Sequence, residues 1–354
     1  MRPEVLEYLA CPHCGGDLEL QGQRDSGTVP SATLTCSTGP ETFPVESGVP
    51  RLLPDAGTAR RPESEHQPET ARAFGAQWKM YEYGHTTWGL TVEERVRIVL
   101  HELDWSERDL AGKVILDAGC GNGTLSAALA DRGATVVALD LSDSVIRAQQ
   151  HRSRPNLHFV QGNLFFPPLK PGVFDAIYSC GVFHHTPDTR RCFDALVPTL
   201  KADVESRYFV WLYSRRSRLF NATVEPTMKV TRRMRDAWLV PLCVALAPFV
   251  EAASRVSTKL GAVEYAPRSL PDRAIQLHDL LSPPFVWYHS FEEAREWARS
   301  AGLRQIERTR YDRAAARTEK DADLLQKYRT LCRPGFGMLC RALDRERARR
   351  PVAV

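Results

Sequence analysis

The chain has 354 residues and a mass of 39.8 kDa, which exceeds one average domain and predicts about two modules. Because 43% of the residues are hydrophobic and 25% are charged, the chain can bury a sizeable core, and this excludes a disordered or fibrous protein. The formal net charge of +4 is far below that of a protein that coats nucleic acid.

Three sequence features bear on the cellular compartment. The N-terminus carries charges where a signal peptide would be apolar. The longest nearly uncharged apolar run, residues 237–250, is shorter than the roughly 20 residues that span a bilayer. Nine cysteines scattered over a long chain argue against a secreted disulfide framework. We therefore expect a cytoplasmic globular protein.

The first third of the chain divides by composition. Residues 1–56 predict a small separate unit, with a tight Cys-Pro-His-Cys knuckle near its start. Residues 57–73 are polar, contain prolines and predict a linker. Residues 74–110 begin with an aromatic stretch and predict a leader that ends in a helix from about Thr91 to Asp104.

From residue 111 onward, predicted strands and helices alternate. The strands are expected at 113–120, 135–140, 157–163, 174–181, 207–214, 303–310 and 334–343. The helices are expected at 124–132, 142–151 with Ser142 as its cap, 187–200, and 290–302 with Gly302 at its end. This alternation predicts an α/β fold with a doubly wound, mostly parallel seven-stranded sheet in residues 111–354. Residues 215–287 interrupt the pattern and predict a helical cap insertion.

The sharpest motif is VILDAGCGNGTL, residues 114–125, which runs from a buried strand through three glycines into a helix. Glycine suits a backbone that turns tightly and approaches a ligand closely, although the spacing also fits a dinucleotide-binding turn. Asp117 precedes the first glycine, where its carboxylate could accept a hydrogen bond from an ammonium group but would repel a pyrophosphate. Asp140 ends the next strand, where it could accept hydrogen bonds from both ribose hydroxyls.

With these motifs in order, residues 74–214 resemble a class I S-adenosylmethionine-dependent methyltransferase. DAGCGNG matches the first motif of that family, FVQGNLFFPPL the segment beside the adenine, and FDAIYSCGVFHHTPD the fourth strand with its loop. The resemblance implies S-adenosylmethionine as the cofactor. It implies these cofactor-binding residues: Asp117, Gly119, Cys120, Gly121, Asn122, Gly123, Asp140, Leu141, Asn163, Leu164 and Cys180. Asn163 stands where the family usually has Asp, and it keeps an acceptor oxygen for the adenine amino group.

Methyl transfer from a sulfonium is an in-line displacement that needs alignment, and a base when the acceptor begins protonated. His184 and His185 follow the fourth predicted strand, on the edge where open α/β sheets bind ligands, and are candidate bases. His185 is preferred. The alternative is that one of the pair caps the next helix or packs near the methionine end of the cofactor.

In similar enzymes, an aromatic leader folds over the cofactor and acceptor. The candidate acceptor-binding residues are Trp78, Tyr81, Trp88 and Phe183, with Gln77, Tyr83 and His85 as further lining residues. The alternative is that Trp78 and Trp88 only pack the leader onto the sheet.

Residues 1–56 resemble a Trm112-like zinc ribbon, a module found beside or fused to methyltransferases. The resemblance implies Cys11, Cys14 and Cys36 as metal ligands, but Gly39 stands where the fourth ligand belongs. An open three-ligand zinc site and a ribbon without metal both remain open.

The leading functional hypothesis is methyl transfer to a small molecule, such as a secondary metabolite, sugar or lipid intermediate. RNA methylation is a second hypothesis, weakened by the lack of an Asn-Pro-Pro-Tyr-like motif after the fourth strand. The third is a non-catalytic adaptor that binds S-adenosylmethionine or a partner protein. The intact Asp117, Gly119, Gly121 and Asp140 argue against it.

The insertion begins with a basic stretch. Residues 205–236 hold eight basic and three acidic residues, a net charge of +5, and the apolar run 237–250 follows. This pattern predicts either solvated arginines beside a buried cap helix, or an anionic or amphiphilic acceptor. Peripheral contact with an anionic membrane through residues 207–250 would use the same surface.

Overall fold

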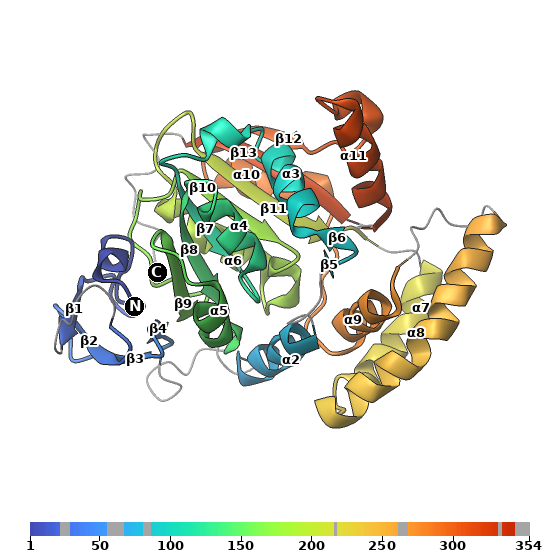
Figure 1. Ribbon diagram of the computed structural model, residues 1–354, viewed down its shortest axis with the longest axis horizontal. Coiled ribbons are helices and arrows are strands. Elements are labelled where there is room, and N and C mark those ends of the chain that lie inside the picture. The colour runs from blue at the N-terminus through green and yellow to red at the C-terminus, as the bar shows by residue number, and fades with distance from the viewer. Residues whose placement is uncertain are drawn as a thin grey trace.

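The computed structural model describes residues 1–21, 29–54, 67–80, 86–215, 218–260, 268–331 and 335–343. Its central sheet contains all seven predicted strands (Figure 1). In chain order they are β7 Val114–Ala118, β8 Thr135–Asp140, β9 Leu157–Gly162, β10 Ala176–Cys180, β11 Arg207–Tyr213, β12 Leu303–Arg308 and β13 Gly335–Leu343. The spatial order is β9-β8-β7-β10-β11-β13-β12, with the first five strands parallel and β13 antiparallel to both neighbours. The predicted doubly wound, mostly parallel sheet is confirmed.

The N-terminal ribbon extends this sheet. It contains the short helix η1 Pro3–Glu7 and four strands, β1 Leu18–Gln21, β2 Ala32–Cys36, β3 Thr42–Glu46 and β4 Val49–Leu52. Strand β4 pairs in parallel with β9, Arg51 opposite Gln161, and these two side chains share a 2.7 Å hydrogen bond. The described sheet therefore has 11 strands, four more than the seven predicted, because the ribbon strands join it. The pairing covers an edge of β9 that would otherwise expose unpaired backbone groups.

Helices cover both faces of the sheet because its strand residues alternate between two apolar layers. One layer packs residues of β7 and β8, such as Leu116 and Val137, against α6 Thr189–Leu196 and α10 Phe291–Ser300. The other packs the alternate residues, such as Ile115 and Val136, against three helices. These are α3 Val92–Glu102, α4 Thr124–Ala130 and α5 Ser144–Arg152.

The ends of these helices mostly match local signals. Thr91 forms a capping box with Glu94 at the start of α3, and Gly302 follows α10 with a φ of 84°. The expected cap of α5 is wrong, because Asp143 precedes the helix and the Ser142 hydroxyl donates to Asp140 instead, at 2.7 Å.

Several elements lie outside the alternating pattern. The helix α11 Glu319–Leu331 was not predicted; it packs beside α3. The remaining short elements are β5 Thr86–Thr87, β6 Leu90–Thr91, η2 Glu107–Asp109, η3 Phe183–His185, η4 Val197–Thr199 and η5 Arg313–Ala315.

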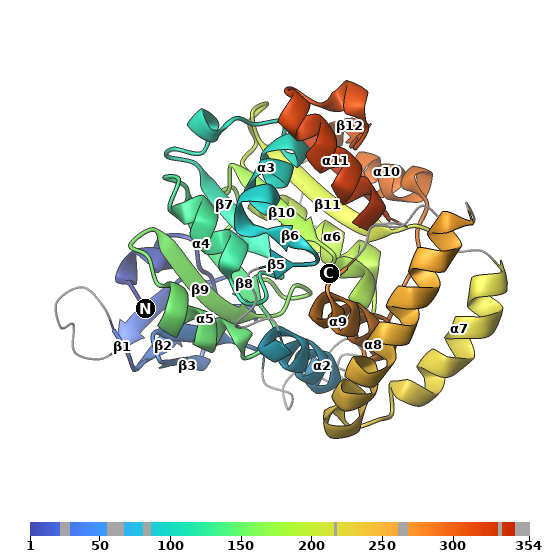
Figure 2. The same cartoon turned by 45° about the vertical axis from the view of Figure 1, so that its right-hand side comes forward.

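The leader and the insertion lie together beyond the carboxyl ends of the parallel strands (Figure 2). The leader helix α2 Gln67–Met80 begins inside the predicted linker, whose residues 57–66 lie outside the described residues. The insertion contains α7 Arg218–Thr231, α8 Asp236–Lys259 and α9 Leu270–Leu281. Helix α9 contacts α2, α7 and α8, and these contacts place the insertion beside the leader.

Candidate active site

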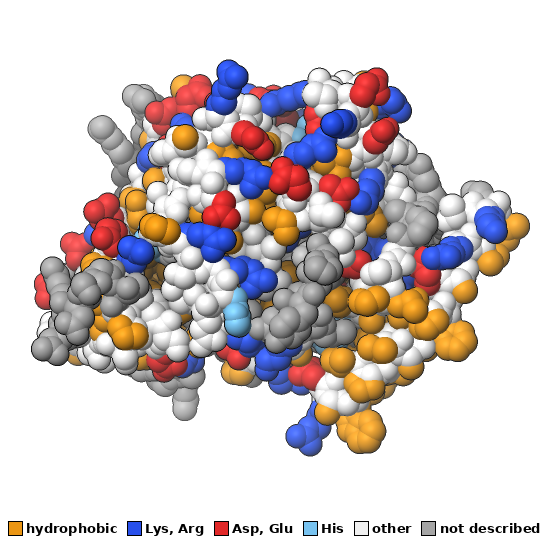
Figure 3. Space-filling view, viewed as in Figure 1, with side chains coloured by type: hydrophobic (Ala, Val, Ile, Leu, Met, Phe, Trp, Pro, Cys, Tyr) orange, Lys and Arg blue, Asp and Glu red, His pale blue; other side chains and the backbone are white. Residues whose placement is uncertain are grey.

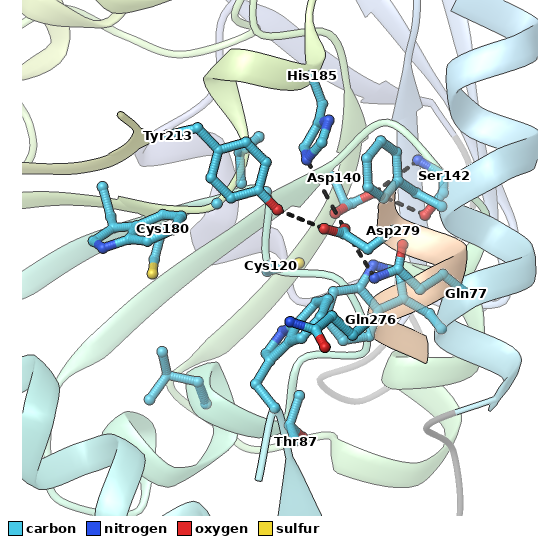
Figure 4. Close-up of a pocket in the computed structure, with 18 of the residues that line it drawn as sticks. Gln77, Thr87, Cys120, Asp140, Ser142, Cys180, His185, Tyr213, Gln276 and Asp279 are labelled. Atoms are coloured by element: carbon cyan, nitrogen blue, oxygen red, sulfur yellow. Dashed lines mark hydrogen bonds and ion pairs between the residues drawn. The ribbon is translucent and has the colours of Figure 1, made fainter. Parts of the chain in front are cut away.

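A cavity of about 480 Å³ lies at the carboxyl ends of the parallel strands. The sheet, the leader helix α2 and the cap helices α8 and α9 all contribute to its wall. Figure 4 shows part of this lining. The size and mixed lining of the cavity are those of a small-molecule site.

The glycine-rich turn shapes one end of this cavity. Gly119, Gly121 and Gly123 have φ values of 86°, 58° and 69°, which favour glycine. A Cβ at Gly119 would lie 2.3 Å from the Val182 side chain, and one at Gly121 would lie 2.2 Å from the Trp78 ring. The missing side chains therefore let both the loop after β10 and the leader approach the turn.

Asp140 joins the turn to the next strand. Its carboxylate accepts hydrogen bonds from the backbone N–H of Gly121 at 2.8 Å and from the backbone N–H of Ser142 at 2.8 Å. It also accepts from the Ser142 hydroxyl, and burial raises its pKa. An ionised carboxylate offers about four acceptor positions, so ribose hydroxyls would share Asp140 with these donors.

Asp117 lies on the cavity wall with its carboxylate nearly buried. Burial raises its pKa from 3.8 to about 6, while a 2.6 Å hydrogen bond from the Ser126 hydroxyl and the charge of Arg95 act in the opposite direction. A ligand ammonium group placed here would favour the ionised form. These properties suit the methionine end of S-adenosylmethionine.

The other predicted cofactor residues divide into two groups. Cys120, Leu141, Asn163, Leu164 and Cys180 line the cavity. Asn122 and Gly123 instead build the turn, since the Asn122 side chain accepts from the Thr124 N–H at 3.2 Å.

The cavity wall also contains a polar cluster centred on Asp279 of α9. Its carboxylate accepts a 2.7 Å hydrogen bond from the Tyr213 hydroxyl and a 3.2 Å hydrogen bond from the Gln77 amide. Figure 4 shows these side chains and His185 converging on Asp279. Four segments distant in sequence thus meet at one carboxylate.

His185 is held in one orientation within this cluster. Its Nδ1 lies 3.1 Å from the carbonyl oxygen of Phe285, which can only accept, so Nδ1 carries the proton in the neutral ring. Its Nε2 then bears the lone pair, and among the described residues it has no hydrogen-bond partner. Burial lowers the pKa of His185, which keeps the ring neutral, although Asp279 opposes this shift from 3.9 Å. His185 lines the cavity, and its Nε2 atom is itself buried.

The structure places the two histidines in different surroundings. His184 and Phe183 are fully buried and lie outside the cavity lining. The His184 ring packs against Tyr213 at a centroid distance of 4.0 Å, and burial holds its pKa well below the usual value. His184 and Phe183 therefore pack in the core, and their roles as a base and as an acceptor-binding residue stay predictions.

The leader contributes three of the predicted residues to the cavity: Gln77, Trp78 and Trp88. Tyr81, Tyr83 and His85 lie outside the described residues. Because Trp78 stacks over Gly121, it packs the leader and lines the site at the same time.

The ribbon cysteines form a second candidate site. The Sγ atoms of Cys11, Cys14 and Cys36 all lie within 4.8 Å of one another. Gly39 supplies no ligand, but the Thr38 hydroxyl lies 3.1 Å from the Cys14 sulfur and 3.4 Å from the Cys36 sulfur. A tetrahedral zinc–thiolate site has sulfur atoms roughly 3.8 Å apart, so the three thiols fit such an ion.

The basic residues at the start of the insertion do not all contribute charge to the surface. Arg207 is buried on β11 and pairs with Glu205, so it adds no surface charge. Arg215 is exposed and lies 3.5 Å from Glu293. Arg216 and the side chain of Arg218 lie outside the described structure.

Residues 116–204 match a protein family whose model is described as a methyltransferase domain. The chain is therefore similar to methyltransferases over this region. Over 198 residues it is 30% identical to the ubiquinone biosynthesis O-methyltransferase of Xylella fastidiosa, a match that covers 55% of this chain and 62% of that protein. Over 100 residues it is 37% identical to the enzyme of the same name from Azotobacter vinelandii, covering 25% and 43%. The chain spans less than two thirds of these relatives.

Among solved structures, magnesium protoporphyrin IX methyltransferase from Synechocystis with bound S-adenosylmethionine is 15% identical, with a TM-score of 0.43. The alignment covers 80% of this chain and 99% of that one. The description of the fold follows from the strand order of this chain and does not depend on this likeness.

Sequence reasoning missed several residues of the cavity wall. Tyr213 ends a predicted strand, so its place at the carboxyl edge could have been inferred. Asp279 lies in an insertion helix without any recognisable motif, and only the docking of α9 against α2 brings it to the site.

Proposed function

We propose that the protein transfers the methyl group of S-adenosylmethionine to a small-molecule acceptor. The observation that carries this proposal is one cavity with two differently equipped ends. Asp117 and Asp140 lie at the ends of neighbouring parallel strands, and His185, whose buried Nε2 has no hydrogen-bond partner among the described residues, lines the same cavity. The match of residues 116–204 to a methyltransferase domain supports the same chemistry.

When bound, S-adenosylmethionine supplies an electrophilic methyl group and leaves as S-adenosylhomocysteine. Asp117 would hold its ammonium group, and Asp140 its ribose hydroxyls. Asn163 lines the same end and would face the adenine. Its Oδ1 already accepts from the Phe165 N–H at 2.9 Å, so the adenine amino group would use the second lone pair of that oxygen.

His185 would accept the acceptor proton at Nε2 as the acceptor atom attacks the methyl carbon. Asp279 would stabilise the resulting imidazolium from 3.9 Å, and the Phe285 carbonyl fixes the ring orientation. A neutral histidine is a suitable base for a hydroxyl, phenol or amine. The relatives' name, O-methyltransferase, favours a hydroxyl acceptor.

The acceptor we propose is amphiphilic. Apolar side chains such as Phe74, Leu277 and Leu280 line the cavity beside its polar cluster. Arg95 also lines the cavity and could pair with an anionic group on the acceptor, although its charge acts on Asp117 as well. Arg268 and Arg273 are less suited, because Arg268 donates to backbone carbonyls and Arg273 pairs with the buried Glu251.

Titration calorimetry with S-adenosylmethionine and S-adenosylhomocysteine tests the first half of the proposal. We expect micromolar binding of both. A panel of phenols, alcohols and amines, read by a mass gain of one CH₂, then tests transfer. Absence of binding for both cofactor forms would contradict the function, whereas binding without any transfer would favour the adaptor hypothesis.

We also propose that the ribbon binds zinc through Cys11, Cys14 and Cys36, with water or the Thr38 hydroxyl completing the site. Zinc measured by elemental analysis of untagged protein should approach one equivalent and fall in a Cys14→Ser variant. A Cys192→Ser variant is the control, because Cys192 is buried in the core away from the ribbon. Untagged protein that folds normally without zinc would contradict this proposal.

A further inference from the structure

Helix α8 is rich in apolar side chains, yet the rest of the protein covers little of its surface. Among the described residues it is the one helix long and apolar enough to cross a membrane, yet only 22% of its most apolar window is buried. Residues 237–250 of this helix contain no charged side chain. Large exposed apolar patches on a monomer mark interaction surfaces.

The covered and uncovered residues of α8 form two opposite stripes. Leu239, Cys243 and Ala247 are buried and recur every four residues. Trp238 and Phe249 are 71% and 72% exposed, and at about 100° per residue they lie only about 20° apart around the helix axis. Val244, Leu246 and Val256 are also exposed. In Figure 3, apolar side chains gather on the outer surface of α7 and α8.

Positive charge surrounds this apolar stripe. Residues 218–259 hold seven basic and three acidic residues, a net of +4, which equals the charge of the whole chain. Lys229, Arg233 and Arg235 are exposed before the stripe, and Arg255 and Lys259 are exposed after it.

The acidic side chains on these two helices do little to offset that charge. Asp236 pairs with Arg72 of the leader, and the buried Glu251 pairs both with the buried Arg273 and with the exposed Arg255. Glu225 is the exposed acid.

We propose that the outer face of α7 and α8 docks on an anionic lipid bilayer. An apolar stripe flanked by cations matches the boundary between acyl chains and anionic headgroups, with Trp238 near the headgroups. A second copy of the chain fits less well, because pairing this face with itself would bring two cationic rims together.

The helix lies on the bilayer and does not cross it. Its inner stripe is tied to the cap, since Glu251 forms buried ion-pair contacts with Arg273 and also accepts from the Arg268 backbone N–H at 3.3 Å. Crossing the membrane would require breaking these contacts and exposing buried charges to lipid.

The inner side of the same helix forms part of the cavity wall. Val250 and Ser254 of α8 line it together with Leu277 and Leu280 of α9. Docking therefore places the acceptor end of the cavity next to the membrane surface, where an amphiphilic acceptor would be concentrated. This second step rests on the proposed methyl transfer, whereas docking itself does not.

Flotation of the full-length protein with lipid vesicles tests docking, without S-adenosylmethionine or acceptor. We expect binding to vesicles of phosphatidylcholine with about one third phosphatidylglycerol, and much weaker binding to phosphatidylcholine alone. Raising the salt well above about 0.15 M should weaken binding, because exposed charges are screened. The Trp238→Ser/Phe249→Ser variant should partition roughly tenfold less or weaker still, because two aromatic side chains no longer enter the lipid.

Val204→Ser is the matched control. Val204 is a comparably exposed apolar residue just before β11, at the amino edge of the sheet and away from the cap. Wild-type protein that ignores anionic vesicles, or a double variant that binds like wild type, would overturn docking. A wild-type dimer that the double variant converts to a monomer, without any lipid binding, would show that the face joins two copies. Cofactor binding measured in parallel separates these outcomes from failure of the proposed function.

Discussion

The two ends of the cavity are built in different ways. The cofactor end comes from one nearly continuous part of the chain, between Asp117 and Leu164, and local backbone geometry shapes it. The acceptor end comes from the leader, the loop after β10, the end of β11 and the cap, and one of its hydrogen bonds joins residues 202 positions apart. The cofactor end is therefore built mainly by the loops of the sheet, with Trp78 of the leader beside Gly121, whereas the acceptor end exists only when leader and cap are docked.

The largest predicted effect is at His185, and it tests whether the two ends of the cavity act independently. His185→Gln should lower kcat by about 10²–10⁴-fold, the usual contribution of a general base, and leave cofactor affinity nearly unchanged. Steady-state kinetics and calorimetry measure the two quantities separately. If cofactor affinity fell as much as kcat, the two ends would not be independent.

Asp279→Asn serves as the companion variant, because Asp279 acts through His185. Losing the carboxylate removes the interaction that raises the pKa of His185, so the acidic limb of the kcat profile should move to lower pH. A purely structural role would lower the rate at every pH without moving that limb.

At the cofactor end, Asp140→Ala should weaken S-adenosylmethionine binding by about 1.5–3 kcal/mol, the range for hydrogen bonds to a charged group. Calorimetry measures this loss, with Asp143→Ala as the control, since the Asp143 side chain makes no capping bond to α5. An Asp140 variant with parental affinity would show that the ribose lies elsewhere.

A buried acid, Glu102, lies behind Tyr178 and Tyr328, and these two tyrosines line the cavity. Burial raises its pKa from 4.5 to about 7, against hydrogen bonds from Tyr311, Tyr178 and Tyr328. The native state keeps this proton to higher pH than the unfolded chain does, so its contribution to stability is lost as pH rises from about 4.5 through about 7.

Glu102→Gln should remove this dependence and stabilise the protein at about pH 8 by on the order of 2 kcal/mol relative to wild type. Denaturant unfolding at about pH 5 and about pH 8 measures the change. Equal pH dependence in both proteins would mean that Glu102 is ionised in the native state across this range.

The smallest predicted effect concerns Asp117. Its raised pKa of about 6 means that, below this pH, the neutral acid predominates and no longer attracts the ammonium group of the cofactor. Affinity for S-adenosylmethionine should therefore fall on acidification, by at most about tenfold per pH unit. Asp117→Asn should bind weakly with a flat profile, and an equally steep profile in that variant would assign the titration to another group.

The sequence by itself determined the parts of this protein whose signals are local. Alternating apolar runs predicted the seven strands of the core, and the glycine spacing after Asp117 predicted the turn. The end of the next strand predicted the position of Asp140. The strands, the turn and this position each depend on residues within a few positions of one another. His185 was named from its place after a strand, but the sequence could not separate it from His184, since neighbouring side chains on a loop can point in opposite directions.

Only the tertiary structure decided the rest. The pairing of β4 with β9, the arrival of Asp279 beside Tyr213 and Gln77, and the exposed face of α8 all depend on contacts across many residues. Such contacts arise from the docking of whole elements, which buries one stripe of a helix and leaves another uncovered. The sequence of an apolar run such as 237–250 does not show whether protein or lipid covers it. In this fold, protein covers only one side of that run.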